Sequence, residues 1–180
     1  MSEDCVILVD DLDNPIGEMD KLEAHKQARL HRAFSVFIMN EAGEMLLHKR
    51  ALEKYHSGGL WTNACCSHPR PGESVLQAAN RRLDEEMGMS TELSALFHFS
   101  YYAKFENGLT EYELDHVVLG YSEVDPQPQP SEVMDYRWMP LEELLYELNE
   151  NPERYTVWFR IALPRLLEFI ETKSENSTKQ

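Results

Sequence analysis

The run Ser67-His-Pro-Arg-Pro-Gly-Glu73-Ser-Val-Leu-Gln-Ala-Ala-Asn-Arg-Arg-Leu-Asp-Glu-Glu-Met-Gly-Met89 carries the best-marked helix of the sequence. Between residues 73 and 87, apolar side chains recur near helical spacing, and Gly88 stands where a helix C-cap is expected. Four charged residues gather on this helix: Glu73, Arg81, Glu85 and Glu86. One interpretation is a solvated face with ion pairs across one turn. The other is a carboxylate cluster that holds Mg²⁺ beside a diphosphate, since Mg²⁺ prefers oxygen ligands.

Strands are predicted on both sides of this helix. Alternating, β-branched or aromatic patterns favour strands at 5–9, 32–39, 44–48, 93–103, 112–123 and 133–139, with 32–39 and 44–48 forming a hairpin. Two more helices are expected at 141–148 and 152–171, while the state of 20–30 stays open. With no internal repeat or domain break, we expect one α/β (α+β) domain over residues 1–180, with its core at about 30–165 and a polar, frayed tail at about 172–180.

Composition excludes several classes of protein. The net charge is −15, from 32 acidic and 17 basic residues, which argues against a nucleic-acid binder. No apolar run approaches the roughly 20 residues needed to span a membrane. The acidic N-terminus lacks the pattern of a signal peptide, and three cysteines, two of them adjacent, do not make a disulfide framework. We therefore expect a cytoplasmic protein.

A second functional stretch is Trp61-Thr-Asn-Ala-Cys65-Cys66-Ser-His68-Pro69. A buried structural thiol is the simple interpretation of either cysteine. Cys66 and His68 are two residues apart, however, so in extended backbone their side chains share a side. A thiol beside a metal-ligating histidine is a candidate acid or base, and Cys65 is expected to be structural.

Two further patterns supply possible metal ligands. His25 and His31 alone are weak evidence for a metal site. Glu111 and Glu113 project from one face of a strand, and that face could be an ordinary one exposed to solvent. If these residues converge with His68, they form a site of three imidazoles and two carboxylates. Such ligands suit Mn²⁺, Zn²⁺ or Mg²⁺, and the sequence does not choose among them.

Residues 67–89 resemble the Nudix box, Gly-x5-Glu-x7-Arg-Glu-hydrophobic-x-Glu-Glu-x-Gly-hydrophobic. They match at Glu73, Arg81, Leu83, Glu85, Glu86, Gly88 and Met89. Ser67 replaces the first glycine, and Arg82 replaces a glutamate central to metal binding and hydrolysis in ordinary Nudix enzymes. The resemblance therefore implies a Nudix-type mixed β-sheet between helices that no longer hydrolyses diphosphates.

Together, the four patterns resemble the type I isopentenyl diphosphate isomerases over residues 5–165. The most specific parts are Trp-Thr-Asn-x-x-Cys-x-His-Pro and Glu-x-Glu, and His31-Arg-Ala-Phe-Ser35 adds to them. The resemblance implies conversion of isopentenyl diphosphate to dimethylallyl diphosphate by addition and removal of a proton, in isoprenoid precursor biosynthesis. The implied substrate is a small diphosphate, with no nucleic acid or membrane partner, and the implied state is a monomer or weak homo-oligomer.

The resemblance also implies roles for individual residues. The metal ligands would be His25, His31, His68, Glu111 and Glu113, with Glu86 holding a Mg²⁺ shared with the substrate. The diphosphate contacts would be Lys21, Arg50, Lys54 and Arg82. The acid and base would be Cys66 and Glu113, the latter with Tyr101, and Trp158 would face the cationic intermediate. Two alternatives stay open, a Nudix pyrophosphohydrolase and a catalytically silent binding module.

Overall fold

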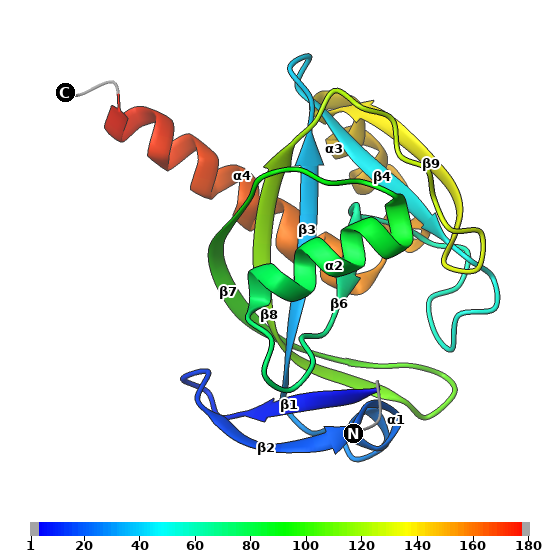
Figure 1. The fold of residues 1–180 in the computed structure, drawn as a ribbon. Coiled ribbons are helices and arrows are strands. Elements are labelled where there is room, and N and C mark those ends of the chain that lie inside the picture. Colours follow the sequence, from blue (N-terminus) through cyan, green and yellow to red (C-terminus); the bar gives the residue numbers. More distant parts are fainter. Residues whose placement is uncertain (1–3, 178–180) are drawn as a thin grey trace.

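The computed structural model describes residues 4–177 as a large mixed β-sheet with helices on both faces (Figure 1). The strands are β1 (Cys5–Val9), β2 (Pro15–Asp20), β3 (His31–Met39), β4 (Glu44–Arg50), β5 (Trp61–Thr62), β6 (Cys65–Ser67), β7 (Leu93–Lys104), β8 (Thr110–Tyr121) and β9 (Val133–Pro140). The helices are α1 (Lys21–Lys26), α2 (Val75–Met87), α3 (Leu141–Glu150), a 3₁₀ turn η1 (Pro152–Arg154) and α4 (Val157–Ser177). The predicted mixed fold is confirmed.

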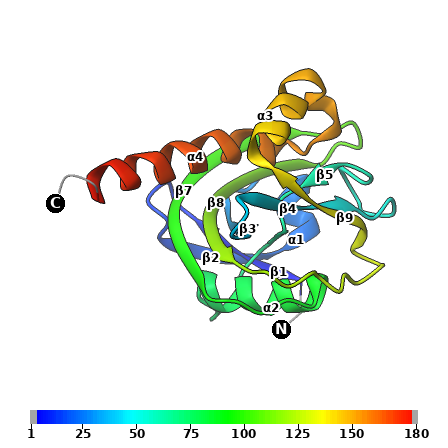
Figure 2. The same ribbon diagram turned by 90° about the horizontal axis from the view of Figure 1, so that it is seen from above.

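Strand β3 is the centre of the sheet. It pairs in parallel with β8 from His31–Glu113 to Met39–Tyr121, and antiparallel with β6 through Ser35–Cys66. Its alternating side chains are buried on both faces, as expected for a strand covered on two sides. Val36 packs in the cluster beneath α2, and Phe37 packs in the cluster beneath α4. Figure 2 shows these two helices on opposite sides of the sheet.

The predicted hairpin of 32–39 with 44–48 is wrong in its pairing. Strands β3 and β4 follow one another through a tight turn, yet they pair only at Met39–Met45. Beyond that point β3 pairs with β6 and β8, whereas β4 pairs with β5 and β9. The two strands diverge because each stretch of a strand edge can bind only one neighbour, and β6 and β8 occupy the edges of β3 where β4 would otherwise pair.

Helix α2 begins and ends where its sequence signals stand. Ser74 caps it and forms a capping box with Gln77, so the helix starts two residues later than predicted. Gly88 ends it in the left-handed conformation, with φ of 59°. A Cβ at this position would lie 2.8 Å from the carbonyl oxygen of Gln127, which leaves room only for glycine.

Near both ends of the chain, regular secondary structure extends further than the sequence predicted. Residues 15–26, of which the sequence left 20–26 open, form β2 and α1 across the lower end of the sheet (Figure 1). Helix α4 starts at Val157, after η1, and continues past Glu171 to Ser177 instead of fraying at 172. Residues 178–180 of the predicted tail lie outside the described residues. Within residues 4–177, no helix is long and apolar enough to cross a membrane.

Candidate active site

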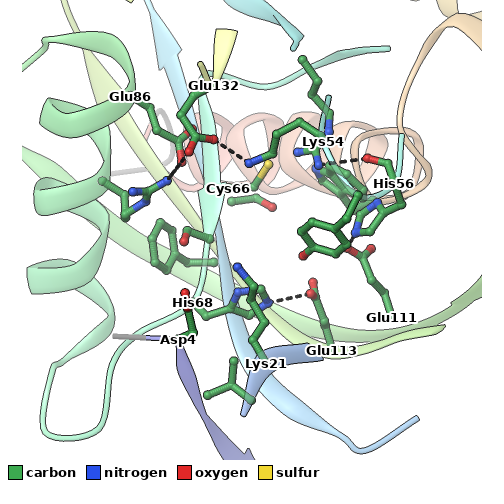
Figure 3. A pocket seen from close by; sticks show the side chains of 18 of the residues that line it. Asp4, Lys21, Lys54, His56, Cys66, His68, Glu86, Glu111, Glu113 and Glu132 are labelled. Atoms are coloured by element: carbon green, nitrogen blue, oxygen red, sulfur yellow. Dashed lines mark hydrogen bonds and ion pairs between the residues drawn. The ribbon is translucent and has the colours of Figure 1, made fainter. Parts of the chain in front are cut away.

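A cavity of about 290 Å³ lies where α1, β6, β8 and α2 meet. It is lined by the side chains that the sequence singled out, among them Cys66, His68, Glu86, Glu111 and Glu113. In the view of Figure 3, Cys66 lies between the Glu86 and Glu132 carboxylates on one side and the His68–Glu113 contact on the other. The cavity therefore joins the helix carboxylates, the thiol and the histidines in one site.

Three histidines and Glu113 come together although they belong to separate elements. His68 Nε2 lies 2.8 Å from Glu113 Oε1 and 3.2 Å from His31 Nε2. Glu113 Oε1 lies 3.4 Å from His31 Nε2 and 4.0 Å from His25 Nε2. The parallel register explains part of this arrangement, because His31 is the partner of Glu113 across β3 and β8. These four residues can hold a metal ion.

Backbone carbonyl groups fix the tautomer of two of these rings. His25 Nδ1 lies 2.6 Å from the carbonyl oxygen of Lys21, and His31 Nδ1 lies 2.8 Å from that of Arg29. In each ring, Nδ1–H donates to the carbonyl, which leaves the lone pair of Nε2 directed at the cluster. His25 Nε2 is buried and has no hydrogen-bond partner within the described chain. Such an orphaned nitrogen fits a metal ligand.

Glu111 takes a different position from the one expected. It lies two residues before Glu113 on the same face of β8, but the four-residue group does not include it. Its Oε1 lies 2.6 Å from Nε2 of His56, and together with His25 they form a second group of possible ligands. Tyr101 links the two carboxylates, since its hydroxyl lies 2.7 Å from Glu111 Oε2 and 2.6 Å from Glu113 Oε2.

Sequence reasoning missed His56. It lies in the loop before β5, in the stretch Tyr55-His-Ser57, and no spacing relates it to the other histidines. The structure buries it, with its ring stacked 4.3 Å from that of Phe105. Only folding places it beside Glu111.

Burial and neighbouring charges shift the protonation of the cluster. Burial opposes ionisation of Glu113, but hydrogen bonds from His31 and His68 prevail and hold its pKa well below the usual value. Burial lowers the pKa of His68 to about 4, so its imidazole is neutral at pH 7. Burial opposes protonation of His31, but Glu113 raises the pKa of this ring above its usual value, so a divalent cation that binds here would displace a proton.

The two adjacent cysteines face different surroundings. Cys66 is half-buried and lines the cavity, while Cys65 is fully buried in the cluster beneath α2. Burial raises the pKa of the Cys66 thiol to about 12, against the opposing effect of Arg50. Cys66 is therefore a protonated thiol in the cavity wall, and Cys65 packs in the core.

All four predicted diphosphate contacts line the cavity: Lys21, Arg50, Lys54 and Arg82. Arg82 Nη1 donates to Glu85 at 2.7 Å, and Nη2 donates to Glu86. Lys54 donates to Glu132, a carboxylate that sequence reasoning also missed because it stands in a proline-rich link. Burial raises the pKa of Glu86, with Arg82 opposing. Two of the four basic groups, those of Arg82 and Lys54, are thus held by carboxylates.

Trp158 of α4 closes the cavity from the other face of the sheet. Its side chain is buried, and the guanidinium carbon of Arg50 lies 5.1 Å from the centre of its ring. The indole lines the same cavity as Cys66 and Glu113. Its position is compatible with an aromatic wall against a bound substrate.

Comparison with known proteins agrees with these features. The Nudix domain model matches residues 29–159. An isopentenyl-diphosphate Delta-isomerase of Pectobacterium atrosepticum is 47% identical, with 96% of this chain and 97% of the relative covered. One of Serratia proteamaculans is 49% identical, with 87% and 88% covered. The chain belongs to the isopentenyl-diphosphate Delta-isomerase family of Nudix proteins.

Solved structures show the same fold at low sequence identity. Protein DR0079 of Deinococcus radiodurans superimposes with a TM-score of 0.75 at 18% identity, with 89% of this chain and 98% of that chain covered. A MutT protein of Methanosarcina mazei gives a TM-score of 0.62 at 21% identity, with 82% and 95% covered. The structural similarity establishes the Nudix fold, and the sequence relatives identify the isomerase family within it.

Proposed function

We propose that this protein interconverts isopentenyl diphosphate and dimethylallyl diphosphate and so supplies isoprenoid precursors. The observation that carries the proposal is the shared cavity, which brings a thiol, a histidine–glutamate cluster and four basic side chains around one space. A diphosphate needs the positive charge of the four basic side chains, and a double-bond shift needs an acid and a base near the alkene. The relatives that carry the isomerase name span nearly the whole chain.

The basic side chains bind the diphosphate. Lys21, Arg50, Lys54 and Arg82 supply the positive charge, with Arg82 offering a planar fork that suits phosphate oxygens. Glu86 would hold a Mg²⁺ together with the diphosphate, since Mg²⁺ commonly combines one or two carboxylates with substrate phosphates. Arg82 thereby has a function at the position where hydrolases keep glutamate.

The histidine–glutamate cluster holds a second divalent cation, for which Mn²⁺, Zn²⁺ and Mg²⁺ are the candidates. The proposed ligands are His25, His31, His68 and Glu113, which form one group of possible ligands, together with Glu111, which lies beside them with His25 in a second group. A bound cation strengthens the acidity of nearby groups because it stabilises their deprotonated forms. Tyr101 holds both glutamates in place through its hydroxyl.

The reaction needs one proton delivered and one removed. One of Cys66 and Glu113 protonates the terminal alkene carbon, which produces a tertiary cation-like state, and the other removes a proton from C2. Glu113 would work with Tyr101, and Cys66 would act on the opposite face of the substrate. An unactivated alkene is a weak base, so its protonation needs an acid held close to the reacting carbon in a site that excludes competing water.

Trp158 stabilises the cation-like state. An aromatic face attracts a desolvated cation by about 2 kcal/mol, and this attraction is absent for the neutral alkene. Trp158→Leu should therefore lower kcat by roughly 30-fold, whereas Trp158→Phe, which keeps a ring, should lose less. Turnover of both variants measures the effect.

Incubation with isopentenyl diphosphate and Mg²⁺, followed by analysis of products, tests the proposal. An allylic diphosphate supports the isomerase, and released phosphate would instead indicate a hydrolase. Neither product, with binding intact, would indicate a binding module. We expect a monomer or weak homo-oligomer in the cytoplasm, where the Cys66 thiol stays reduced, and size-exclusion chromatography with light scattering checks the assembly.

A further inference from the structure

Three buried polar side chains join the start of α4 to the segment that carries Cys66. Thr62, Asn63 and Thr156 are each 0% exposed. The Thr62 hydroxyl donates to Asn63 Oδ1 at 2.8 Å, and its oxygen lies 2.8 Å from Oγ1 of Thr156. Because Thr62 gives its one hydroxyl hydrogen to Asn63, the Thr156 hydroxyl is the donor of the second bond. The backbone N–H of Thr156 also donates to the carbonyl oxygen of Trp61 at 3.0 Å.

Asn63 extends these hydrogen bonds to β3 and β6. Its Nδ2 donates to the carbonyl oxygen of Val36 at 2.9 Å and to that of Cys65 at 2.8 Å. Two carbonyl acceptors require the nitrogen of the side-chain amide on their side, which leaves Oδ1 for the Thr62 hydroxyl. The network therefore runs without a gap from α4 to the central strand of the sheet.

Both ends of this network lie next to residues of the proposed reaction. Trp158 follows Thr156 by two residues, and Cys66 follows Asn63 by three. Trp158 and Cys66 both line the cavity, whereas Thr156 is not among the residues that line it. Any effect of the Thr156 hydroxyl on the reaction must therefore pass through the residues that it places.

Apolar packing already holds α4 against the sheet. Phe159, Leu163 and Leu166 are fully buried in the same cluster as Phe37 of β3. Burial of apolar surface has no preferred direction, whereas hydrogen bonds require a narrow range of distances and angles. A fully paired buried network therefore specifies one arrangement of the elements that it joins. Such a network also carries a cost of desolvation, which valine in place of threonine would avoid.

We propose that Thr156 is a positioning residue of the reaction. Its hydroxyl, bonded to Thr62, fixes the start of α4 so that the indole of Trp158 faces the bound substrate. The inference rests on the proposed function, because it assigns a further residue to that same site. Turnover is sensitive to such placement, since a displacement of about 1 Å caused by a change far from the chemistry can cost about 10²-fold.

Thr156→Val keeps the shape of the side chain and removes the hydroxyl. It should lower kcat for isopentenyl diphosphate by about tenfold and leave KM within about twofold, because placement of Trp158 is lost while diphosphate binding is kept. Thr156→Ser, which keeps the hydroxyl, should restore most of kcat. Thr91→Val is the matched control, since the Thr91 hydroxyl also donates a hydrogen bond, to the carbonyl oxygen of Tyr121, but lies outside the site.

The same substitution in a Trp158→Leu background separates positioning from a general loss of structure. A residue that acts through Trp158 loses its effect once the indole is gone, so Thr156→Val should then cost less than about twofold in kcat. Equal losses in both backgrounds, or a wild-type kcat in folded Thr156→Val, would overturn the inference. If Thr156→Val does not fold, Thr62→Val breaks the same contact from β5 and is judged by the same comparison.

A nuclear magnetic resonance spectrum without substrate distinguishes failure of this inference from failure of the proposed function. With ¹⁵N-labelled tryptophan, the indole N–H signal of Trp158, assigned by its loss in Trp158→Phe, should move in Thr156→Val. The signal of Trp138, whose Nε1 donates to Asp125 away from the network, should stay. An unmoved Trp158 signal would overturn the inference. If the signal moves but wild type converts no isopentenyl diphosphate, the proposed function fails and the placement of Trp158 by Thr156 stands.

Discussion

His68 Nε2 lies 2.8 Å from Glu113 Oε1, although 45 residues separate the two in the chain. The contact forms because β6 and β8 both flank β3, one antiparallel and one parallel. It joins the Cys-x-His loop to the Glu-x-Glu strand at one end of the sheet. The geometry of the proposed metal centre depends on this contact.

Glu113→Gln should weaken metal binding at least tenfold, because it removes the charge of a central ligand and keeps its shape. Bound metal should then raise the free energy of unfolding less in the variant than in wild type. In wild type, metal at 100 times its Kd raises this free energy by about 2.7 kcal/mol. Thermal melts with and without Mn²⁺ measure the difference. Glu18→Gln, on the exposed strand β2, is the control. An unchanged metal-induced shift in Glu113→Gln would remove Glu113 from the ligands.

Cys66→Ala should lower isomerase turnover by about 10²–10⁴-fold, the range typical of losing a general acid or base. Cys65→Ala is the matched control, since the neighbouring thiol is packed in the core and should cost only about 1 kcal/mol of stability. Turnover of both variants, with circular dichroism as a check of folding, separates the roles. Near-normal conversion by Cys66→Ala would contradict a catalytic thiol.

Asp13 should affect the metal centre indirectly, by fixing the hairpin that leads to His25. Arg32 donates to its carboxylate and to its backbone carbonyl, each at 2.7 Å, and His116 Nε2 contacts it at 2.9 Å. These contacts fasten the β1–β2 turn to β3 and β8, and that hairpin leads directly into α1 and His25.

Asp13→Ala should therefore lower stability by about 2 kcal/mol and weaken metal binding severalfold. Urea unfolding and Mn²⁺ titration give the two values. Asp11→Asn, an exposed change in the same turn, should leave both near wild type. Equal metal affinity in Asp13→Ala and wild type would show that the hairpin does not position His25.

His48 should make the fold sensitive to acid. It is buried, its Nδ1 lies 2.9 Å from the carbonyl oxygen of Ala64, and burial lowers its pKa from 6.5 to about 4. Below pH 6.5 the unfolded chain binds a proton that the folded chain does not. Stability is therefore complete above pH 6.5 and falls as the pH drops towards 4, by roughly 3 kcal/mol from this group.

His48→Asn keeps a donor near the Ala64 carbonyl and removes the titration. Its free energy of unfolding should depend less on pH between 6.5 and 4 than that of wild type, although its stability at pH 8 is lower. Urea unfolding across this range measures both slopes. Equal slopes would show that His48 does not contribute to acid sensitivity.

Where the local sequence signals were complete, they predicted the helices and strands correctly. The glycine at 88 marks the end of α2, and the alternating patterns of 93–103 and 112–123 became β7 and β8. Pairing was less predictable, because the tight turn after Met39 indicated a hairpin while β3 takes its partners from residues far along the chain. Local spacing carries no information about such long-range competition.

The sequence by itself determined the Nudix scaffold, the isomerase family and most of the chemistry-bearing residues, because these depend on motifs of fixed spacing. Only the tertiary structure decided that Glu111 pairs with His56 and that Glu132 holds Lys54. The physical reason is that a side chain's neighbours across a sheet or a loop are set by the packing of the whole chain. Residue type supplies the chemistry, and the fold decides which groups meet.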